Sequence, residues 1–224
     1  MPPNLVGYAQ SALDTNYGAV MTSAQFVNIS ANDGTISLGA IKPLAGGDVD
    51  TGYLVEIQIL DNAGLTTEDA YTWNGAFWEN TLTGVDASEV QFAPGQGLWV
   101  MSSIGEAAGL QSVGKVGTAD VDFALDTDYG AVVAGNPFPV AVALIDMLPI
   151  AGAGVDTGYL VEIQLLDNAG LTTDDAYTWN GTSWENTLTG ADVSEVTFDP
   201  GQGLWIMSSI GEAAVIRFPA PEFN

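Results

Sequence analysis

The stretch that decides the fold is DTGYLVEIQ at Asp50–Gln58, because the same nine letters recur at Asp156–Gln164. The offset is 156 minus 50, or 106 residues, and the match continues without a gap to Ala108 and Ala214. Nine of the 59 aligned positions differ. A sequence that repeats itself at a fixed offset indicates a repeated structural unit. The chain is therefore two copies of one unit joined end to end.

The front part of each copy matches more weakly and at a different offset. LDTNYGAV at Leu13–Val20 corresponds to LDTDYGAV at Leu125–Val132, an offset of 112 residues. Copy one therefore carries six extra residues, and we place them in Asn28–Gly34. The sequence predicts two modules, residues 1–112 and residues 113–224, each of ordinary domain size.

Short strands dominate the pattern within each copy. Tyr53–Leu60 alternates apolar and polar residues, which is typical of a half-buried strand. YTWNGAFW at Tyr71–Trp78 predicts a hairpin, because Asn-Gly suits a tight type I′ turn. Residues 85–92 and 98–101 read as further strands, and 140–147 is the best candidate for a short helix. We predict an all-β chain of two tandem β-sandwich or small-barrel modules with little helix.

The segment between the copies lacks the composition of a flexible linker. Gly109–Leu125 contains Leu110, Val113, Val116 and Phe123 with polar residues between them, which is a strand-like pattern. A flexible linker would be rich in glycine and serine. We therefore expect the last strand of the first module to lead almost directly into the first strand of the second.

The charge of the chain excludes several classes of function. There are 28 acidic residues against three basic ones, Lys42, Lys115 and Arg217, and the formal net charge is -25. Binding to nucleic acid or to an anionic membrane needs many more cations. The chain has no histidine and no cysteine, so it offers no imidazole or thiolate for catalysis or metal binding.

The low lysine content and acidic surface favour an extracellular or cell-surface protein, and the alternative is an acidic cytosolic protein from a saline habitat. The first residues lack the basic and apolar regions of a signal peptide, so we expect a signal removed before this numbering begins. No run of 18 apolar residues is present, and we predict no membrane insertion.

Acidic turns in both copies are candidate metal ligands. Their carboxylate and amide oxygens would suit calcium, although the spacing is not that of an EF-hand. The alternative is that these turns are simply solvated. The candidate residues are Asp61, Asn62, Glu68, Asp69, Asp167, Asn168, Asp174 and Asp175. No other cofactor is predicted.

The tryptophans leave two interpretations open. Exposed tryptophan can stack on a sugar ring, and Trp78 and Trp184 are the candidate glycan contacts. The alternative is that the tryptophans pack in the core of a small β domain. Both copies carry the same acids, with none set apart in an asymmetric cleft, so we do not expect an enzyme.

The chain contains GNPFP at Gly135–Pro139, YTWNG at Tyr177–Gly181, PGQGLW at Pro200–Trp205 and IRFPAP at Ile216–Pro221. These motifs resemble those of a loosely defined group of secreted bacterial repeat proteins of Verrucomicrobia-like genomes. Copy one departs from this pattern at Ala24–Phe26, where the Asn-Pro pair is missing. The resemblance implies export and a structural role at the cell surface, and it carries over no functional residues.

The ends of the chain correspond in sequence to the segment that joins the copies, which suggests self-association. A contact that joins modules within a chain could also join chains, head to tail, and give a filament or surface layer. Exchange of a terminal strand would strengthen it. The predicted interface residues are Leu5, Val6, Tyr8, Val215, Ile216 and Phe218.

The expected function is therefore that of a self-assembling extracellular structural protein whose partner is itself. The net charge opposes close packing, so we expect assembly to be favoured by salt or calcium. The alternative is a carbohydrate-binding or adhesion module that recognises an extracellular polysaccharide.

Overall fold

The computed structural model describes residues 6–12, 19–27, 29, 34–44, 55–61, 63–102, 109–125, 131–151, 161–167, 169, 171–208 and 214–222. No α-helix occurs in these ranges, which contain strands and two single turns of 3-10 helix, Leu38–Ala40 and Leu144–Asp146. The two turns are equivalent, and the second is the only helical structure in residues 140–147, the segment predicted as a short helix. No helix in the described ranges is long and apolar enough to cross a membrane. The prediction of an all-β chain is confirmed.

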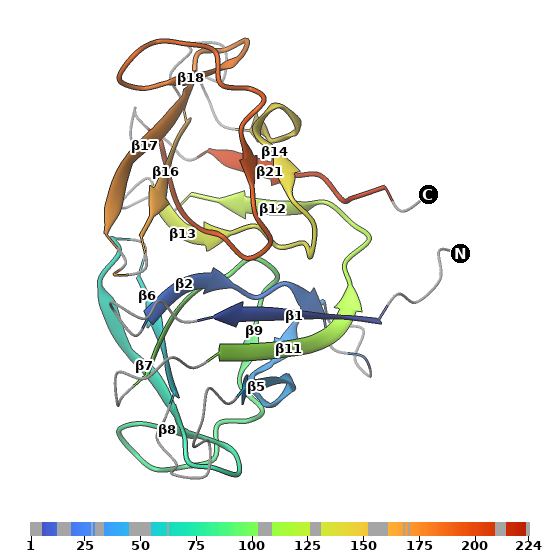
Figure 1. Cartoon of the computed structure of the whole chain (residues 1–224), viewed down its shortest axis with the longest axis vertical. Coiled ribbons are helices and arrows are strands. Elements are labelled where there is room, and N and C mark those ends of the chain that lie inside the picture. Colours follow the sequence, from blue (N-terminus) through green and yellow to red (C-terminus); the bar gives the residue numbers. More distant parts are fainter. Residues whose placement is uncertain are drawn as a thin grey trace.

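The first half contains two main sheets, both antiparallel (Figure 1). In small sheet 1, the central strand β11 (Gly109–Val116) pairs with β1 (Val6–Ala12) and with both β3 (Phe26–Val27) and β5 (Ile41–Leu44). Large sheet 1 has the order β2 (Ala19–Ser23), β10 (Gly97–Ser102), β6 (Val55–Leu60), β7 (Thr66–Trp73) and β8 (Trp78–Asn80). A further pair joins β4 (Ile36–Ser37) to β9 (Gln91–Phe92).

The second half repeats this plan. Small sheet 2 has the order β12 (Val121–Ala124), β21 (Val215–Phe218) and β15 (Leu148–Ala151). Large sheet 2 has the order β13 (Ala131–Gly135), β20 (Gly203–Ser208), β16 (Val161–Leu166), β17 (Thr172–Trp179) and β18 (Trp184–Asn186). The further pair is β14 (Val142–Ala143) with β19 (Thr197–Phe198).

The strand registers give the equivalence of the halves residue by residue. Ser11 is the Cα partner of Leu110, and Phe123 is the partner of Ile216. Leu110 and Ile216 are 106 residues apart, so Ser11 and Phe123 are equivalent at 123 minus 11, or 112, the offset of the front parts. The offset returns to 106 at β4 and β14, since 142 minus 36 is 106. The six extra residues therefore lie between Val27 and Ile36, as predicted.

The four main sheets are arranged like the blades of a four-bladed propeller, two in each half (Figure 1). Two similar halves are thus confirmed. The finer assignment of each half as a sandwich or a small barrel stays a prediction. The boundary between residues 112 and 113 also stays a prediction, and β11 runs through it without a break.

Each half has one hydrophobic core, to which both of its main sheets contribute. In the first half, Phe26 and Leu110 of the small sheet pack with Ile57 and Val100 of the large sheet. Trp78 is completely buried there, and its indole N–H donates to the carbonyl of Ile41 at 2.7 Å. The second half repeats this arrangement, since Trp184 donates to the carbonyl of Met147 at 3.0 Å. A buried indole N–H needs such a partner, so the bond fixes how the large sheet sits on the small one.

The predicted hairpin at residues 71–78 is present, with a wider turn than expected. Trp73 and Trp78 are Cα partners, so the loop between them has four residues instead of two. The Asn74 side chain accepts hydrogen bonds from the backbone N–H groups of Ala76 and Phe77 at 3.0 and 3.1 Å. Gly75 takes the positive φ of 98° that only glycine adopts without strain.

The predicted strand over residues 85–92 is mostly wrong. Only β9, at its end, is a strand, and Asp86 forms an isolated bridge with Glu79. Val85 is 63% exposed whereas Ala87 is buried, so the two side chains do not share a packed face. Their exchange in the second half places Val193 against the core and leaves alanine at the exposed position.

The junction between the halves is as direct as the sequence predicts. Strand β11 ends at Val116, residues 117–120 cross to the second half, and β12 begins at Val121 (Figure 1). The crossing segment, the start of β1 and the described residues that follow β21 lie on the same side of the molecule (Figure 1).

The contact between the halves is reciprocal, which the sequence did not suggest. Its apolar centre consists of three pairs of equivalent residues: Met21 with Val133, Leu60 with Leu166, and Trp99 with Trp205. Such an isologous contact uses the same patch on both partners and closes on itself.

Two glycines allow the halves to approach closely. A Cβ atom on Gly97 would lie 2.7 Å from Cγ1 of Val133, and one on Gly203 would lie 2.7 Å from Cβ of Met21. Gly97 is equivalent to Gly203, and Met21 is equivalent to Val133, so each contact is the image of the other. The backbone of Gly135 also donates to the carbonyl of Gly95 at 2.9 Å. The in-chain contact is therefore complete in one molecule.

Candidate functional site

The outer face of small sheet 1 differs from the rest of this acidic molecule. The strands β1, β3, β5 and β11 contain no aspartate or glutamate, whereas the strands of large sheet 1 contain Glu56, Glu68, Asp69 and Glu79. We call the outward side chains of small sheet 1 the acid-free face. It includes Val6, Tyr8, Gln10, Val27, Lys42, Gln111, Val113 and Lys115.

Strand pairing aligns these side chains in rows. Val6 is the Cα partner of Lys115, and Tyr8 is the partner of Val113. Directly opposed residues of an antiparallel pair share one face. Alternate residues such as Ala9 and Leu110 point the other way and pack in the core, so the face is fixed by the strand period of two.

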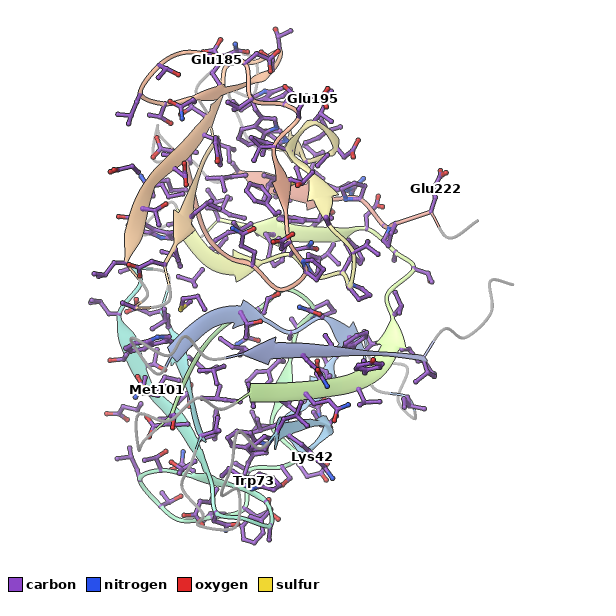
Figure 2. All side chains as sticks on the ribbon, in the orientation of Figure 1. Lys42, Trp73, Met101, Glu185, Glu195 and Glu222 are labelled. Atoms are coloured by element: carbon purple, nitrogen blue, oxygen red, sulfur yellow. The ribbon has the colours of Figure 1, made fainter. Side chains whose placement is uncertain are left out.

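The acid-free face is apolar as well as cationic. Tyr8 is 66% exposed, Val6 56% and Val113 38%, although all three are large enough to favour burial. Lys42 on β5 is also exposed, and Figure 2 labels it there. Adjacent exposed apolar side chains of this kind mark interaction surfaces.

The equivalent face of the second half carries an ion-pair cluster. Arg217 of β21 holds Asp122 of β12 by two hydrogen bonds, both 2.7 Å, and approaches Asp120 at 3.6 Å. Asp120 also accepts the backbone N–H of Ala220 at 3.0 Å. The hydrogen bond from Arg217 lowers the pKa of Asp122 below its ordinary value, and burial opposes this slightly.

All three basic residues therefore lie on the outer faces of the two small sheets. Arg217 is paired within its own sheet, whereas Lys42 and Lys115 form no ion pair among the described residues. The first half has Tyr8, Gln10 and Gln111 at the positions of Asp120, Asp122 and Arg217. The two faces have diverged, and only the first leaves its cations for another partner.

A pocket of about 630 Å³ lies where the two halves meet. Phe123, Phe138 and Val116 supply apolar walls, and Lys115 lies at the point where the pocket adjoins the acid-free face. The lining also includes Gln25, which is 3% exposed and whose Oε1 atom has no hydrogen-bond partner in the described part of the chain.

The predicted glycan contacts are wrong. Trp78 and Trp184 are both 0% exposed, and each packs edge-on against the other tryptophan of its hairpin with ring centres 5.5 Å apart. Neither ring can stack on a sugar, because the core covers it completely. The alternative interpretation, core packing, is confirmed for these two residues.

The structure does not bring the predicted calcium ligands together. No three acidic side chains converge on one point in the described ranges. Asp61 Oδ1 accepts the backbone N–H groups of Ala63 and Leu65, both at 2.9 Å, and Asp167 caps its own turn in the same way. Glu68, Asp69, Asp174 and Asp175 are exposed on β7 and β17. Asn62 and Asn168 lie outside the described residues.

The predicted assembly residues divide into two groups. Val6 and Tyr8 are exposed on the acid-free face, and Val215 is half-buried. Ile216 and Phe218 are 0% exposed and belong to the core of the second half, so their assignment to an interface is wrong. They alternate with Val215 and Arg217 along β21, and a strand of this period buries every second residue. Leu5 lies outside the described residues.

Comparison of the whole chain with protein families, curated proteins and solved structures finds no match.

Proposed function

We propose that the protein is a non-enzymatic extracellular structural protein, a subunit that assembles with copies of itself into a fibre or surface layer. The observation that carries this proposal is the acid-free face on a chain of net charge -25. An acidic protein that only needs solubility gains nothing from exposing Val6, Tyr8 and Val113 beside two lysines. Exposed apolar side chains beside cations, with no acids among them, suit a surface that binds a further acidic molecule.

The reciprocal contact between the halves limits how copies can join. Because that contact is complete within one chain, it is not available to propagate a polymer. Head-to-tail assembly therefore needs an outer surface, and the acid-free face meets that need. We take each half as a two-sheet sandwich, since one core lies between its small and large sheets.

Net repulsion between copies sets the conditions for assembly. At an ionic strength of about 0.01 M the Debye length is about 30 Å, so the acidic surfaces of two copies repel each other over their whole width. At about 0.15 M it falls to about 8 Å, and only groups in contact still interact strongly. Salt then removes the repulsion and retains close pairs, and calcium would act at lower concentration.

Electron microscopy and sedimentation velocity of the purified chain test this proposal. We expect monomers at about 0.01 M salt and ordered assemblies at about 0.15 M salt or with millimolar calcium. Discrete monomers under all of these conditions, at concentrations up to about 100 μM, contradict it.

A further inference from the structure

We propose that the acid-free face of one copy docks on the acidic hairpin end of a second copy. This end, here called the acidic end, comprises Leu65, Glu68 and Asp69 with their equivalents Leu171, Asp174 and Asp175. The proposal rests on the proposed function and names the surfaces that would carry it.

The acidic end is one surface to which both halves contribute. Leu60 and Leu166, the last residues of β6 and β16, belong to the same apolar cluster between the halves. The turns that follow them therefore lie close together, on the side of the molecule opposite residues 117–120, which cross between the halves (Figure 1). The two acidic side chains on each of β7 and β17 are exposed, so the strands that follow these turns carry four exposed carboxylates.

The acidic end also presents apolar side chains. Leu65 and Leu171 are each 65% exposed, although leucine usually lies inside. Each follows a turn whose backbone is held by Asp61 or Asp167, so its position is fixed. The acidic end therefore combines exposed leucines with carboxylates, and the acid-free face combines exposed valines and a tyrosine with lysines. The two surfaces are complementary in charge, and both offer apolar area to bury.

Charge complementarity favours a second copy as the occupant. The acid-free face carries two ammonium groups and no described carboxylate, and the acidic end carries four carboxylates and no cation among its described residues. Contact between them would pair both lysines with carboxylates. Two acid-free faces in contact would place ammonium groups together instead, at a cost in free energy.

The contact is heterologous, because it joins different patches of the two partners. Each bound copy still presents its own acidic end or acid-free face, so the contact can propagate into a filament or close into a ring. The two equivalent hairpins of the acidic end carry the same kinds of side chain, a leucine and two acids. The outer face of small sheet 2 does not compete with the acid-free face for them, because its cation, Arg217, is already paired with Asp122.

A charge-matched pair of variants tests the proposal. Lys42→Gln/Lys115→Gln makes the net charge more negative by two on the acid-free face. Leu148→Glu/Ala124→Glu makes the same change on the equivalent face of the second half, at two exposed positions. Circular dichroism and thermal unfolding first establish that both variants are folded.

We expect the lysine variant to raise the concentration needed for assembly at about 0.15 M salt by at least tenfold, and the control to leave it within about twofold. Glu68→Gln/Asp69→Asn/Asp174→Asn/Asp175→Asn, on the other surface, should weaken assembly although it reduces the net charge. Unchanged assembly of the lysine variant, or stronger assembly of the carboxamide variant, overturns this contact while leaving self-assembly in place. A wild-type chain that never assembles overturns the proposed function and this contact with it.

Discussion

Arg217 occupies on β21 the position that Gln111 occupies on β11, and only Arg217 is held by carboxylates. Its guanidinium bonds to Asp122 in a two-pronged geometry, whereas Gln111 is flanked by Gln10 on one side and Lys42 on the other. In small sheet 2 the cation is thus paired with carboxylates of the same sheet, whereas small sheet 1 presents apolar side chains and two lysines that form no ion pair among the described residues. The following predictions depend on this asymmetry and on the fold that produces it.

The Asp122 carboxyl should titrate at unusually low pH. Its pKa is lowered mainly by the hydrogen bond from Arg217, so this carboxylate stabilises the fold above the unfolded-state pKa, and that stabilisation is lost as the pH falls through the native pKa. Arg217→Gln should return the pKa of Asp122 toward its ordinary value. Side-chain carboxyl NMR titration measures this, with Lys42→Gln, on the other small sheet, as the control that leaves it unchanged. An Asp122 pKa that does not respond to Arg217→Gln contradicts the pairing.

The ion-pair cluster on the outer face of small sheet 2 can be transferred to the acid-free face by substitution. Tyr8→Asp/Gln10→Asp/Gln111→Arg introduces at equivalent positions the three side chains of the ion-pair cluster, with a net charge change of only one. We expect the variant to fold and to lose assembly, because the tyrosine is gone and the new groups pair with each other. Sedimentation velocity at about 0.15 M salt is the measurement. Retained assembly would show that Tyr8 and the open face are not required.

The buried tryptophans should each matter to stability in the same way. Trp78→Phe removes the indole N–H and leaves a cavity and an unpaired Ile41 carbonyl, so the free energy of unfolding should fall by about 2–4 kcal/mol. Trp184→Phe should have a similar effect through Met147. Phe77→Ser, which introduces at an exposed position the residue that the second half has there, Ser183, should change it by less than about 0.5 kcal/mol. Urea unfolding followed by circular dichroism measures these free energies. A Trp78→Phe variant with an unchanged free energy of unfolding would contradict the packing of Trp78 in the core.

The reciprocal contact between the halves predicts paired effects of two glycines. Gly97→Ala and Gly203→Ala each place a methyl group against the opposite half, at Val133 and Met21, and each should destabilise the chain by about 1–3 kcal/mol. Gly117→Ala is the control, since its Cβ would meet only Phe138 at an ordinary 3.6 Å. Val133→Ala should partly rescue Gly97→Ala and should not rescue Gly203→Ala. Equal rescue of both variants would contradict the one-to-one contacts.

The duplication, the strand content and the direct junction could be predicted because they depend on local pattern. Residues 50–58 and their copy alternate with the period of a strand, and Asn74-Gly75 marks a hairpin. The width of that hairpin was missed because the Asn74 side chain, rather than a two-residue turn, organises the loop. The strand predicted over residues 85–92 is mostly wrong because its basis, a shared face for Val85 and Ala87, does not hold: Val85 is exposed and Ala87 is buried.

The contact between the halves and the burial of the tryptophans depend on long-range packing. Gly97 and Gly203 are the first residues of β10 and β20 and directly follow Pro-Gly-Gln turns, so the sequence pattern indicates a chain break there and not a close approach of another backbone. Nothing in Phe77-Trp78 distinguishes a buried ring from an exposed one, because a hairpin strand has one face of each kind. The acid-free face emerges only when β1, β5 and β11 are placed side by side, since Lys42 and Lys115 are far apart in sequence.

The central claim is that the acid-free face of one copy meets the acidic end of the next, and zero-length cross-linking tests it most directly. Carbodiimide joins lysine amines to carboxylates in contact, and the chain has only two lysines. Assemblies formed from equal amounts of light and heavy-isotope protein distinguish links between copies from links within one. We predict mixed-isotope links from Lys42 or Lys115 to Glu68, Asp69, Asp174 or Asp175. Links between copies that consistently join these lysines to other carboxylates, or their absence from assembled protein, would contradict the claim.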